Sequence, residues 1–195
     1  LREIVDGRYD FIYIYDTPTV ININGLDIQL MPWITDSNYD EALEAIKNPK
    51  ASIMMGHLEL SGFKMYRGVI SSHGLDRKLF ENFDAVYSGH YHHRSTVGNV
   101  TYLGAFGEYT WQDFADPRGF SVLDTETRKV EFVQNPYKMF AKVWYDDTKE
   151  TNIDIDYLKS KMVKVIVTNK TNPYMFDTFI SNIEKTGVLD MQIVE

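Results

Sequence analysis

Five histidines are the side chains of this sequence best suited to chemistry, and three of them lie close together. His90, His92 and His93 stand in the segment Ser88–Arg94 (SGHYHHR). Neutral imidazole is the commonest nitrogen ligand for divalent transition metals in proteins. In extended backbone, residues two apart point the same way, so His90 and His92 can converge on one side. The spacing predicts these two as metal ligands, with His93 directed to the opposite side.

His57 is a further candidate ligand, because it follows another short apolar segment. Residues 51–56 (ASIMMG) have the pattern of a strand buried on both faces, and residues 85–88 (AVYS) form another short apolar strand. If these strands are neighbours in one sheet, His57 and His90 meet at its carboxyl edge, where open α/β sheets bind ligands. The alternative is that they are ordinary surface or core histidines. His73 more readily starts a helix than binds a metal.

The composition limits which functions are possible. The 195 residues contain no cysteine, and 28 acidic against 20 basic residues give a net charge of −8. Disulfide scaffolds, thiol catalysis and thiolate metal sites are excluded, so His, Asp, Glu or Asn must hold any metal. No segment approaches the roughly 18–20 apolar residues of a membrane helix. The lack of cysteine is compatible with a cytoplasmic protein, and the acidic balance argues against a protein that coats nucleic acid by bulk charge.

Short strands and a few helices are expected to carry these residues. Asn24-Gly25 favours a tight hairpin, and Pro173 can open a helix that Gly187 ends. The late segments form a β-α-β unit of about 35 residues. The expected strands are 11–15, 19–22, 26–30, 51–56, 85–88, 99–103, 119–123, 130–134, 161–168 and 188–194, and the expected helices are 37–47, 74–83 and 173–185.

Six motifs follow one another in a fixed order, and this order is more specific than any one of them. They are Met31-Pro32-Trp33, Gly56-His57-x-Glu59-Leu60, Ser72-His73-Gly74-Leu75, Ser88-Gly89-His90-x-His92, Tyr102-x-Gly104 and Asp116-Pro117-Arg118-Gly119-Phe120. The set resembles the C-terminal half of the calcineurin-like metallophosphoesterases. Within these it is most similar to the SbcD-type double-strand-break repair nucleases, including the recombination-endonuclease subunits of T4-like phages.

The resemblance implies a fold and its domains. The fold class would be α/β (α+β): the C-terminal half of a four-layer metallophosphoesterase β-sandwich, followed by a small β-α-β capping domain. Residues 1–139 would be the C-terminal part of the phosphoesterase domain. Residues 140–195 would be part of the capping domain, which positions DNA.

The resemblance also implies an activity and its cofactors. The function would be a divalent-metal-dependent DNA exo/endonuclease that processes DNA ends in recombination and repair, with DNA and an SMC-like ATPase subunit as partners. Carried over onto matching positions, His57 and His90 resemble ligands of one ion and His92 a ligand of another, with Mn²⁺ the expected metal. Two such ions clamp the attacking and leaving oxygens at phosphorus.

Several motifs of the family are missing. Asp-x-His, Gly-Asp and Asn-His, which supply further ligands and a catalytic histidine, do not occur in this sequence. No catalytic residue is therefore assigned here. We expect the chain, which starts at Leu1, to be a C-terminal fragment that is inactive alone. The family's dimer-forming helices have no counterpart either, which leaves a homodimer open.

Two other functions stay open. The chain could serve a different calcineurin-like phosphoesterase, acting on a nucleotide or a phosphoprotein. It could also be a non-catalytic β-rich binding module with structural histidines. In that case a His90→Ala change would leave metal affinity unchanged.

Overall fold

The computed structural model describes residues 8–66, 68–149 and 153–195. The chain forms two compact units, Leu1–Phe106 with Pro117–Gln134, and Gly107–Asp116 with Asn135–Glu195. Each has its own hydrophobic core. The predicted domains, 1–139 and 140–195, remain a prediction, because a compact unit is not by itself a phosphoesterase domain or its cap.

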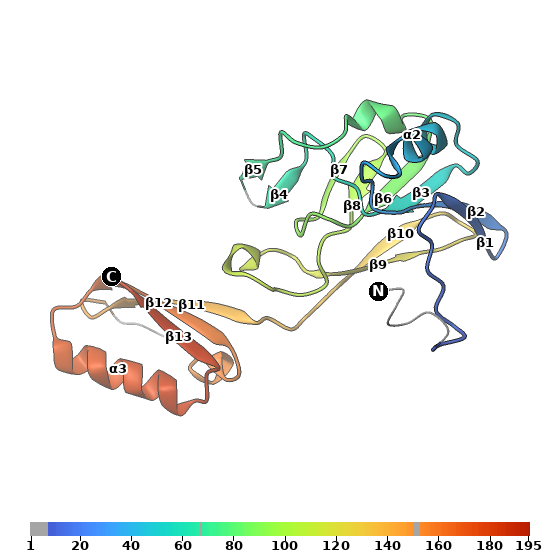
Figure 1. Ribbon diagram of the computed structural model, residues 1–195. Coiled ribbons are helices and arrows are strands. Elements are labelled where there is room, and N and C mark those ends of the chain that lie inside the picture. Colours follow the sequence, from blue (N-terminus) through green and yellow to red (C-terminus); the bar gives the residue numbers. More distant parts are fainter. Residues whose placement is uncertain (1–7, 67, 150–152) are drawn as a thin grey trace. The chain divides into compact units, whose positions relative to one another are not determined.

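A six-stranded mixed sheet is the centre of the first unit (Figure 1). Its four middle strands are parallel, and an antiparallel strand lies at each edge. The first hairpin turns at Asn24 and Gly25, whose φ angles of 50° and 85° suit the tight turn that the sequence predicts. In spatial order the strands are β1 (Thr19–Ile23), β2 (Leu26–Met31), β3 (Ile53–Gly56), β6 (Ala85–Ser88), β8 (Val100–Tyr102) and β7 (Ser95–Val97).

The two faces of this sheet are both buried, as the apolar segment of β3 predicts. Met54 and Val86 point into a core that the helix α2 (Tyr39–Lys47) covers with Ala42 and Ile46. Ile53, on the opposite face, lies in a second cluster that includes the partly buried Leu123 of β9. Strand β9 (Gly119–Leu123) pairs with β10 (Val130–Gln134) as an antiparallel hairpin.

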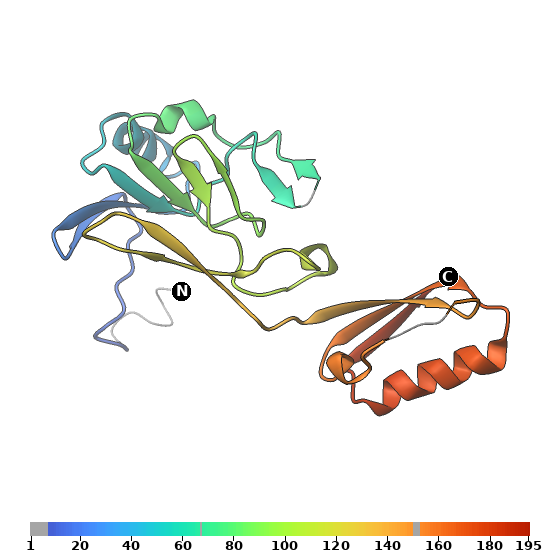
Figure 2. The same ribbon diagram turned by 180° about the vertical axis from the view of Figure 1, so that it is seen from behind.

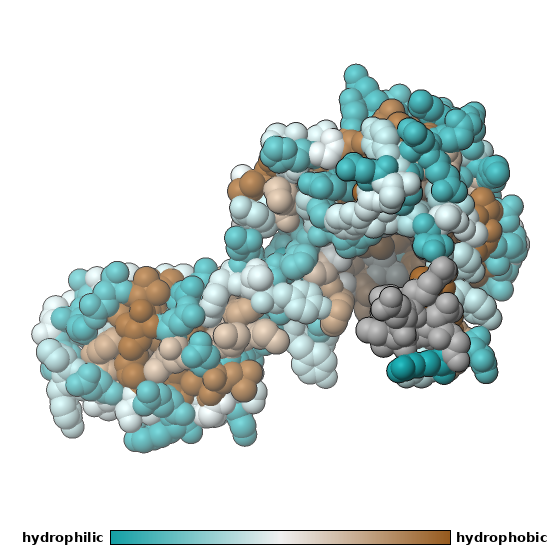
Figure 3. All heavy atoms as spheres, in the orientation of Figure 1, coloured by the Kyte–Doolittle hydropathy of each residue, from teal (hydrophilic) through white to brown (hydrophobic). Residues whose placement is uncertain are grey.

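Three smaller elements complete the first unit. Strands β4 (Lys64–Tyr66) and β5 (Val69–Ile70) form a short hairpin, and η1 (Arg77–Phe80) is a 3₁₀ turn. Figure 3 shows mainly hydrophilic side chains over the region of α2, in keeping with its solvent-facing side.

Two predicted elements of this unit are wrong. Phe11–Tyr15 is not a strand, and Phe11 and Tyr13 are 76% and 74% exposed. Aromatic residues favour strands only where a partner strand gives them a packed surface. The predicted helix 74–83 is reduced to η1, because Gly74 has a left-handed φ of 97° and Asp76 is extended.

The second unit is a three-stranded parallel sheet with one helix on its face (Figure 2). Helix α3 (Pro173–Lys185) packs Phe176 and Ile183 against inward residues of the sheet. The segment 107–116 of this unit contains the 3₁₀ turn η2 (Trp111–Asp113), and the ring centroids of Trp111 and Phe140 are 4.6 Å apart. The strands are β11 (Phe140–Asp146), β12 (Met162–Asn169) and β13 (Asp190–Val194), with η3 (Asp156–Leu158) between the first two.

These observations confirm the coarse fold class, a mixed α/β protein dominated by sheets. The predicted β-α-β unit is present as β12, α3 and β13, and β11 adds a strand that the sequence reasoning missed. The four-layer sandwich stays a prediction. In the described part of the chain, no helix is both long and apolar enough to cross a membrane.

Candidate metal centre

His57 begins the loop that leaves the central strand β3. Gly56 precedes it at a crowded point, where an added Cβ would lie 2.9 Å from the carbonyl oxygen of Met31 on β2. The strands β3 and β6 are parallel partners, with Gly56 opposite Ser88. Their carboxyl ends therefore meet at one edge of the sheet, as the sequence reasoning expected.

His90 lies directly beside His57 at this edge. The two rings are 5.3 Å apart between centroids and meet edge to face at 89°. The backbone N–H of His90 donates a hydrogen bond of 3.3 Å to Nδ1 of His57. Gly89 leaves the room for this approach, since an added Cβ would lie 2.8 Å from the same Nδ1 atom. The structure thus brings together two of the three predicted ligands.

The backbone of the histidine segment differs from the expected one. His90 has a φ of 65°, in the left-handed region, so the segment from His90 to His92 is not extended. Residues other than glycine adopt this conformation at a cost that surrounding contacts must offset, and such strain concentrates at functional sites. The extended backbone predicted for this segment is therefore wrong, and it cannot be what aligns His90 with His92.

His92 is exposed and is positioned through its carbonyl group. Its carbonyl oxygen accepts a hydrogen bond of 3.0 Å from the backbone N–H of Ala105 and another from the guanidinium of the fully buried Arg118. Among the described residues, no three or more His, Asp or Glu side chains come together as a metal site. The assignment of His57, His90 and His92 as metal ligands thus stays a prediction.

Trp33 is the residue of this centre whose role sequence reasoning missed. Its ring lies 5.0 Å from His57 and 5.3 Å from His90, between centroids. Trp33 follows the end of β2, which is the parallel neighbour of β3. The motif Met31-Pro32-Trp33 was visible in the sequence, but only the strand order shows that it ends beside the histidines.

A buried hydrogen-bond network holds the loop after His57. The backbone N–H of Leu58 donates to Oγ of Ser88 at 2.9 Å. The hydroxyl of Tyr102 donates to the carbonyl of Leu58 at 2.9 Å and accepts from the N–H of Leu60 at 3.0 Å. Burial raises the pKa of this Tyr102 hydroxyl, so it stays protonated and able to donate.

The environment of His57 favours its neutral form. Partial burial of the ring lowers its pKa below the ordinary 6.5, and the neighbouring His90 lowers it further by charge repulsion. Neutral imidazole is the form that binds metals. Two adjacent imidazoles suit part of a transition-metal site, and further ligands would have to come from outside this pair.

The neighbouring histidines and polar residues have other roles. His73 makes a local turn, in which its N–H donates to Oγ of Ser71 and its carbonyl accepts from the same hydroxyl. Tyr91 is buried and donates its hydroxyl to the carbonyl of Leu60 at 3.1 Å. Glu59 is exposed.

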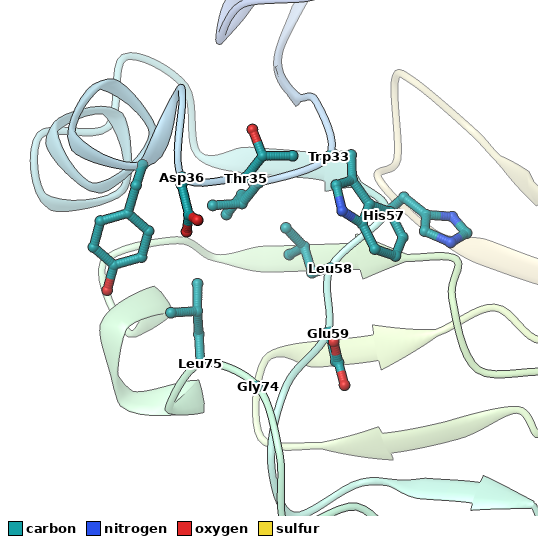
Figure 4. Close-up of a pocket in the computed structure, with 10 residues that line it drawn as sticks. Trp33, Thr35, Asp36, His57, Leu58, Glu59, Gly74 and Leu75 are labelled. Carbon is teal, nitrogen blue, oxygen red and sulfur yellow. The ribbon is translucent and has the colours of Figure 1, made fainter.

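A cavity of about 250 Å³ adjoins the histidine pair (Figure 4). We call it the Trp33 cavity, after one of its lining residues. It is bordered by Trp33, Asp36, Tyr39, His57, Leu58 and Leu75, among others.

The chain is similar to known nuclease subunits. It is 38% identical over 162 residues to exonuclease subunit 1 of Enterobacteria phage T4, which covers 83% of this chain and 47% of that protein. The SbcD subunit of the nuclease SbcCD of Staphylococcus epidermidis is 29% identical over 100 residues, covering 47% of this chain and 26% of that protein. Its counterpart in Staphylococcus saprophyticus is 27% identical over 128 residues, covering 58% and 34%.

No protein-family model matches the chain. The matches with curated proteins nevertheless confirm the resemblance to SbcD-type nucleases and to their phage counterparts. The chain spans about half the length of the T4 protein and a smaller share of the two staphylococcal proteins.

Proposed function

We propose that this chain, a relative of the SbcD-type nuclease subunits, forms part of a divalent-metal-dependent DNA nuclease that processes DNA ends in recombination and repair. One observation supports the metal site above all others. The parallel pairing of β3 and β6 places His57 and His90 side by side at the carboxyl edge of the sheet.

In this proposal, His57, His90 and His92 hold two divalent ions, for which Mn²⁺ is the expected metal. Such ions, when bound, polarise a phosphate and lower the pKa of a coordinated water. Other residues of the chain hold the histidine ligands in place. The turn at Gly89 sets the distance between the two imidazoles, Trp33 packs against both rings, and Tyr102 fixes the loop after His57.

The chain should not cleave DNA on its own. The described residues bring only two histidine rings together, and no third His, Asp or Glu joins them in a metal-binding group. The remaining ligands and a catalytic acid would have to come from residues outside this group. The names of the relatives, each called a subunit, support a partner subunit, which we propose to be an SMC-like ATPase.

Titration of the chain with Mn²⁺, followed by NMR of the histidine ring protons, tests the metal site. Paramagnetic Mn²⁺ should broaden the signals of His57 and His90 first, and His90→Ala should abolish the effect at His57. His73→Ala is the matched control and should leave the broadening unchanged. Equal broadening of all five histidines, or none at His57, would contradict the proposal.

A second experiment tests the nuclease itself. A chimera in which this chain replaces the matching 47% of the T4 relative should degrade linear DNA in Mn²⁺, whereas the chain alone should not. Cleavage of a cyclic nucleotide in place of DNA would favour a different phosphoesterase.

A further inference from the structure

The Trp33 cavity has the make-up of a site for a flat aromatic group. Leu58, which is only 1% exposed, and the partly buried Leu75 give it an apolar lining. Trp33 and Tyr39 add two aromatic rings that are 49% and 41% exposed, so both offer surface to a ligand. Its volume of about 250 Å³ lies just below the roughly 300–1,000 Å³ of drug-sized pockets, which suits a single ring system.

Asp36 offers a hydrogen-bond acceptor to the cavity. Asp36 points toward Leu75 and Leu58 in Figure 4, whereas Glu59 is directed away from them. Within the described residues, the carboxylate of Asp36 has no hydrogen-bond or ion-pair partner. An ionised carboxylate only accepts hydrogen bonds, so a ligand group that pairs with Asp36 must bring a donor.

The charge of the cavity excludes a phosphate as its occupant. Its described lining contains the carboxylates of Asp36 and Glu59 and no lysine or arginine. A phosphate would therefore meet repulsion here, and a neutral group with N–H donors would not.

The cavity shares a wall with the histidine pair. Trp33 lines the cavity and also packs 5.0 Å from the ring of His57, which Figure 4 shows directed away from Asp36. A base that stacks on the exposed surface of Trp33 would thus have its own phosphate close to the two histidines.

We propose that the Trp33 cavity binds the base of a nucleotide whose phosphate lies at the His57–His90 pair, and that it prefers bases with an exocyclic amino group. This inference rests on the proposed nuclease function. Stacking on aromatic rings holds a base of any sequence. Asp36 adds selectivity, because adenine, cytosine and guanine carry an amino donor that projects from the ring, whereas thymine offers only its ring N3–H.

Another occupant with the same chemistry is an arginine or lysine of a partner protein, which could stack on Trp33 and pair with Asp36. The shared Trp33 wall favours the nucleotide, because that occupant alone explains why the cavity adjoins the metal centre. The cationic occupant is therefore an outcome of the test.

Fluorescence of Trp33 in the full chain tests this inference without any metal. The chain has three tryptophans, and the changes Trp111→Phe and Trp144→Phe leave Trp33 as the single emitter. Deoxyadenosine monophosphate and deoxycytidine monophosphate should quench it, and thymidine monophosphate should do so more weakly. Asp36→Ala should weaken the binding of the adenine nucleotide by about tenfold, which is the loss expected for a hydrogen bond to a charged group. Asp40→Ala, an exposed change outside the cavity, should have no effect.

Three results would overturn the inference. The first is that all three nucleotides quench the fluorescence equally and that Asp36→Ala does not change this quenching. The second is quenching by N-acetylarginine amide alone, and the third is no quenching by any of these compounds. The Mn²⁺ titration of His57 and His90 in Asp36→Ala separates this question from the proposed function. Broadening by Mn²⁺ without nucleotide binding would contradict the proposed base site alone. Nucleotide binding without broadening would contradict the proposed metal centre alone.

Discussion

Gly89 is the residue that lets the two histidines approach each other. Gly89→Ala should push the ring of His57 away, because the new Cβ would lie 2.8 Å from Nδ1. We expect shifted His57 ring signals and weaker Mn²⁺ broadening in NMR spectra. Gly107→Ala is the matched control, since its Cβ would meet nothing closer than Tyr109 at 4.0 Å. An unchanged His57 signal in Gly89→Ala would show that the turn does not set the distance between the rings.

The proton affinity of His57 should be lower than that of a free histidine. Burial and His90 lower its pKa, so its NMR titration midpoint should fall below pH 6.5. The unfolded chain takes up this proton near pH 6.5 while the folded chain resists it. The free energy of unfolding should therefore decrease as the pH falls below 6.5. In His57→Gln the decrease should be shallower, and a midpoint at or above 6.5 would contradict the assignment.

Among single residues, the sequence predicted the pairing of His57 with His90 but not the contacts that fix it. The strand-Gly-His pattern occurs twice, and parallel strands bring such patterns to one edge. The left-handed φ of His90 could not be foreseen, because only a small fraction of histidines adopt that region, although histidine is enriched there. The place of Trp33 depends on strand order, which local sequence does not contain.

At the scale of elements, Tyr102 ties strand β8 to the loop that follows β3. Tyr102→Phe should lower the free energy of unfolding of the first unit by about 1–3 kcal/mol. The loss of the Tyr102 hydroxyl leaves the buried N–H of Leu60 and the carbonyl of Leu58 without their hydrogen-bond partner. Denaturant unfolding followed by circular dichroism measures the change.

The control for this prediction is Tyr137→Phe. Tyr137 is 82% exposed, so removal of its hydroxyl should leave the unfolding free energy unchanged. Equal stability of the Tyr102 and Tyr137 variants would mean that water replaces the lost hydrogen bonds.

Elements with a strong local signal were predicted well, and those that depend on distant partners were not. Strands β6, β9 and β10 and helix α3 have the predicted bounds, since each is bordered by turn residues or proline. Strand β11 was missed because Lys142 interrupts its apolar pattern and the charged Asp146 ends it. Parallel pairing with β12 stabilises it nonetheless.

At the scale of the whole molecule, the two separate cores predict that a destabilising substitution in one unit leaves the structure of the other unchanged. Ile183 is fully buried in the core of the second unit, so Ile183→Ala should cost that unit about 2–5 kcal/mol. The NMR signals of His57 and His90 should not change. Leu189→Ala, at a residue that is 66% exposed, is the control. Loss of the histidine signals in Ile183→Ala would show that the units fold as one.

The chain spans about half the length of its T4 relative, of which it covers 47%. The motifs Asp-x-His, Gly-Asp and Asn-His of the family that it resembles are missing from its sequence. The coarse fold class followed from alternating short strands and helices. The division into units did not, because residues 107–116 join the second unit ahead of residues 117–134, which belong to the first.

The pairing of β3 with β6 also has a kinetic consequence. His57 and His90 meet only when two parallel strands, separated by a long stretch of chain, have found each other. Contacts between residues far apart in sequence form late in folding, because the closure of a long loop costs entropy before the contact repays it. The local hairpin β1–β2 and the helix α3 should therefore form first. During refolding, the ability to broaden histidine signals with Mn²⁺ should be among the last native properties to return.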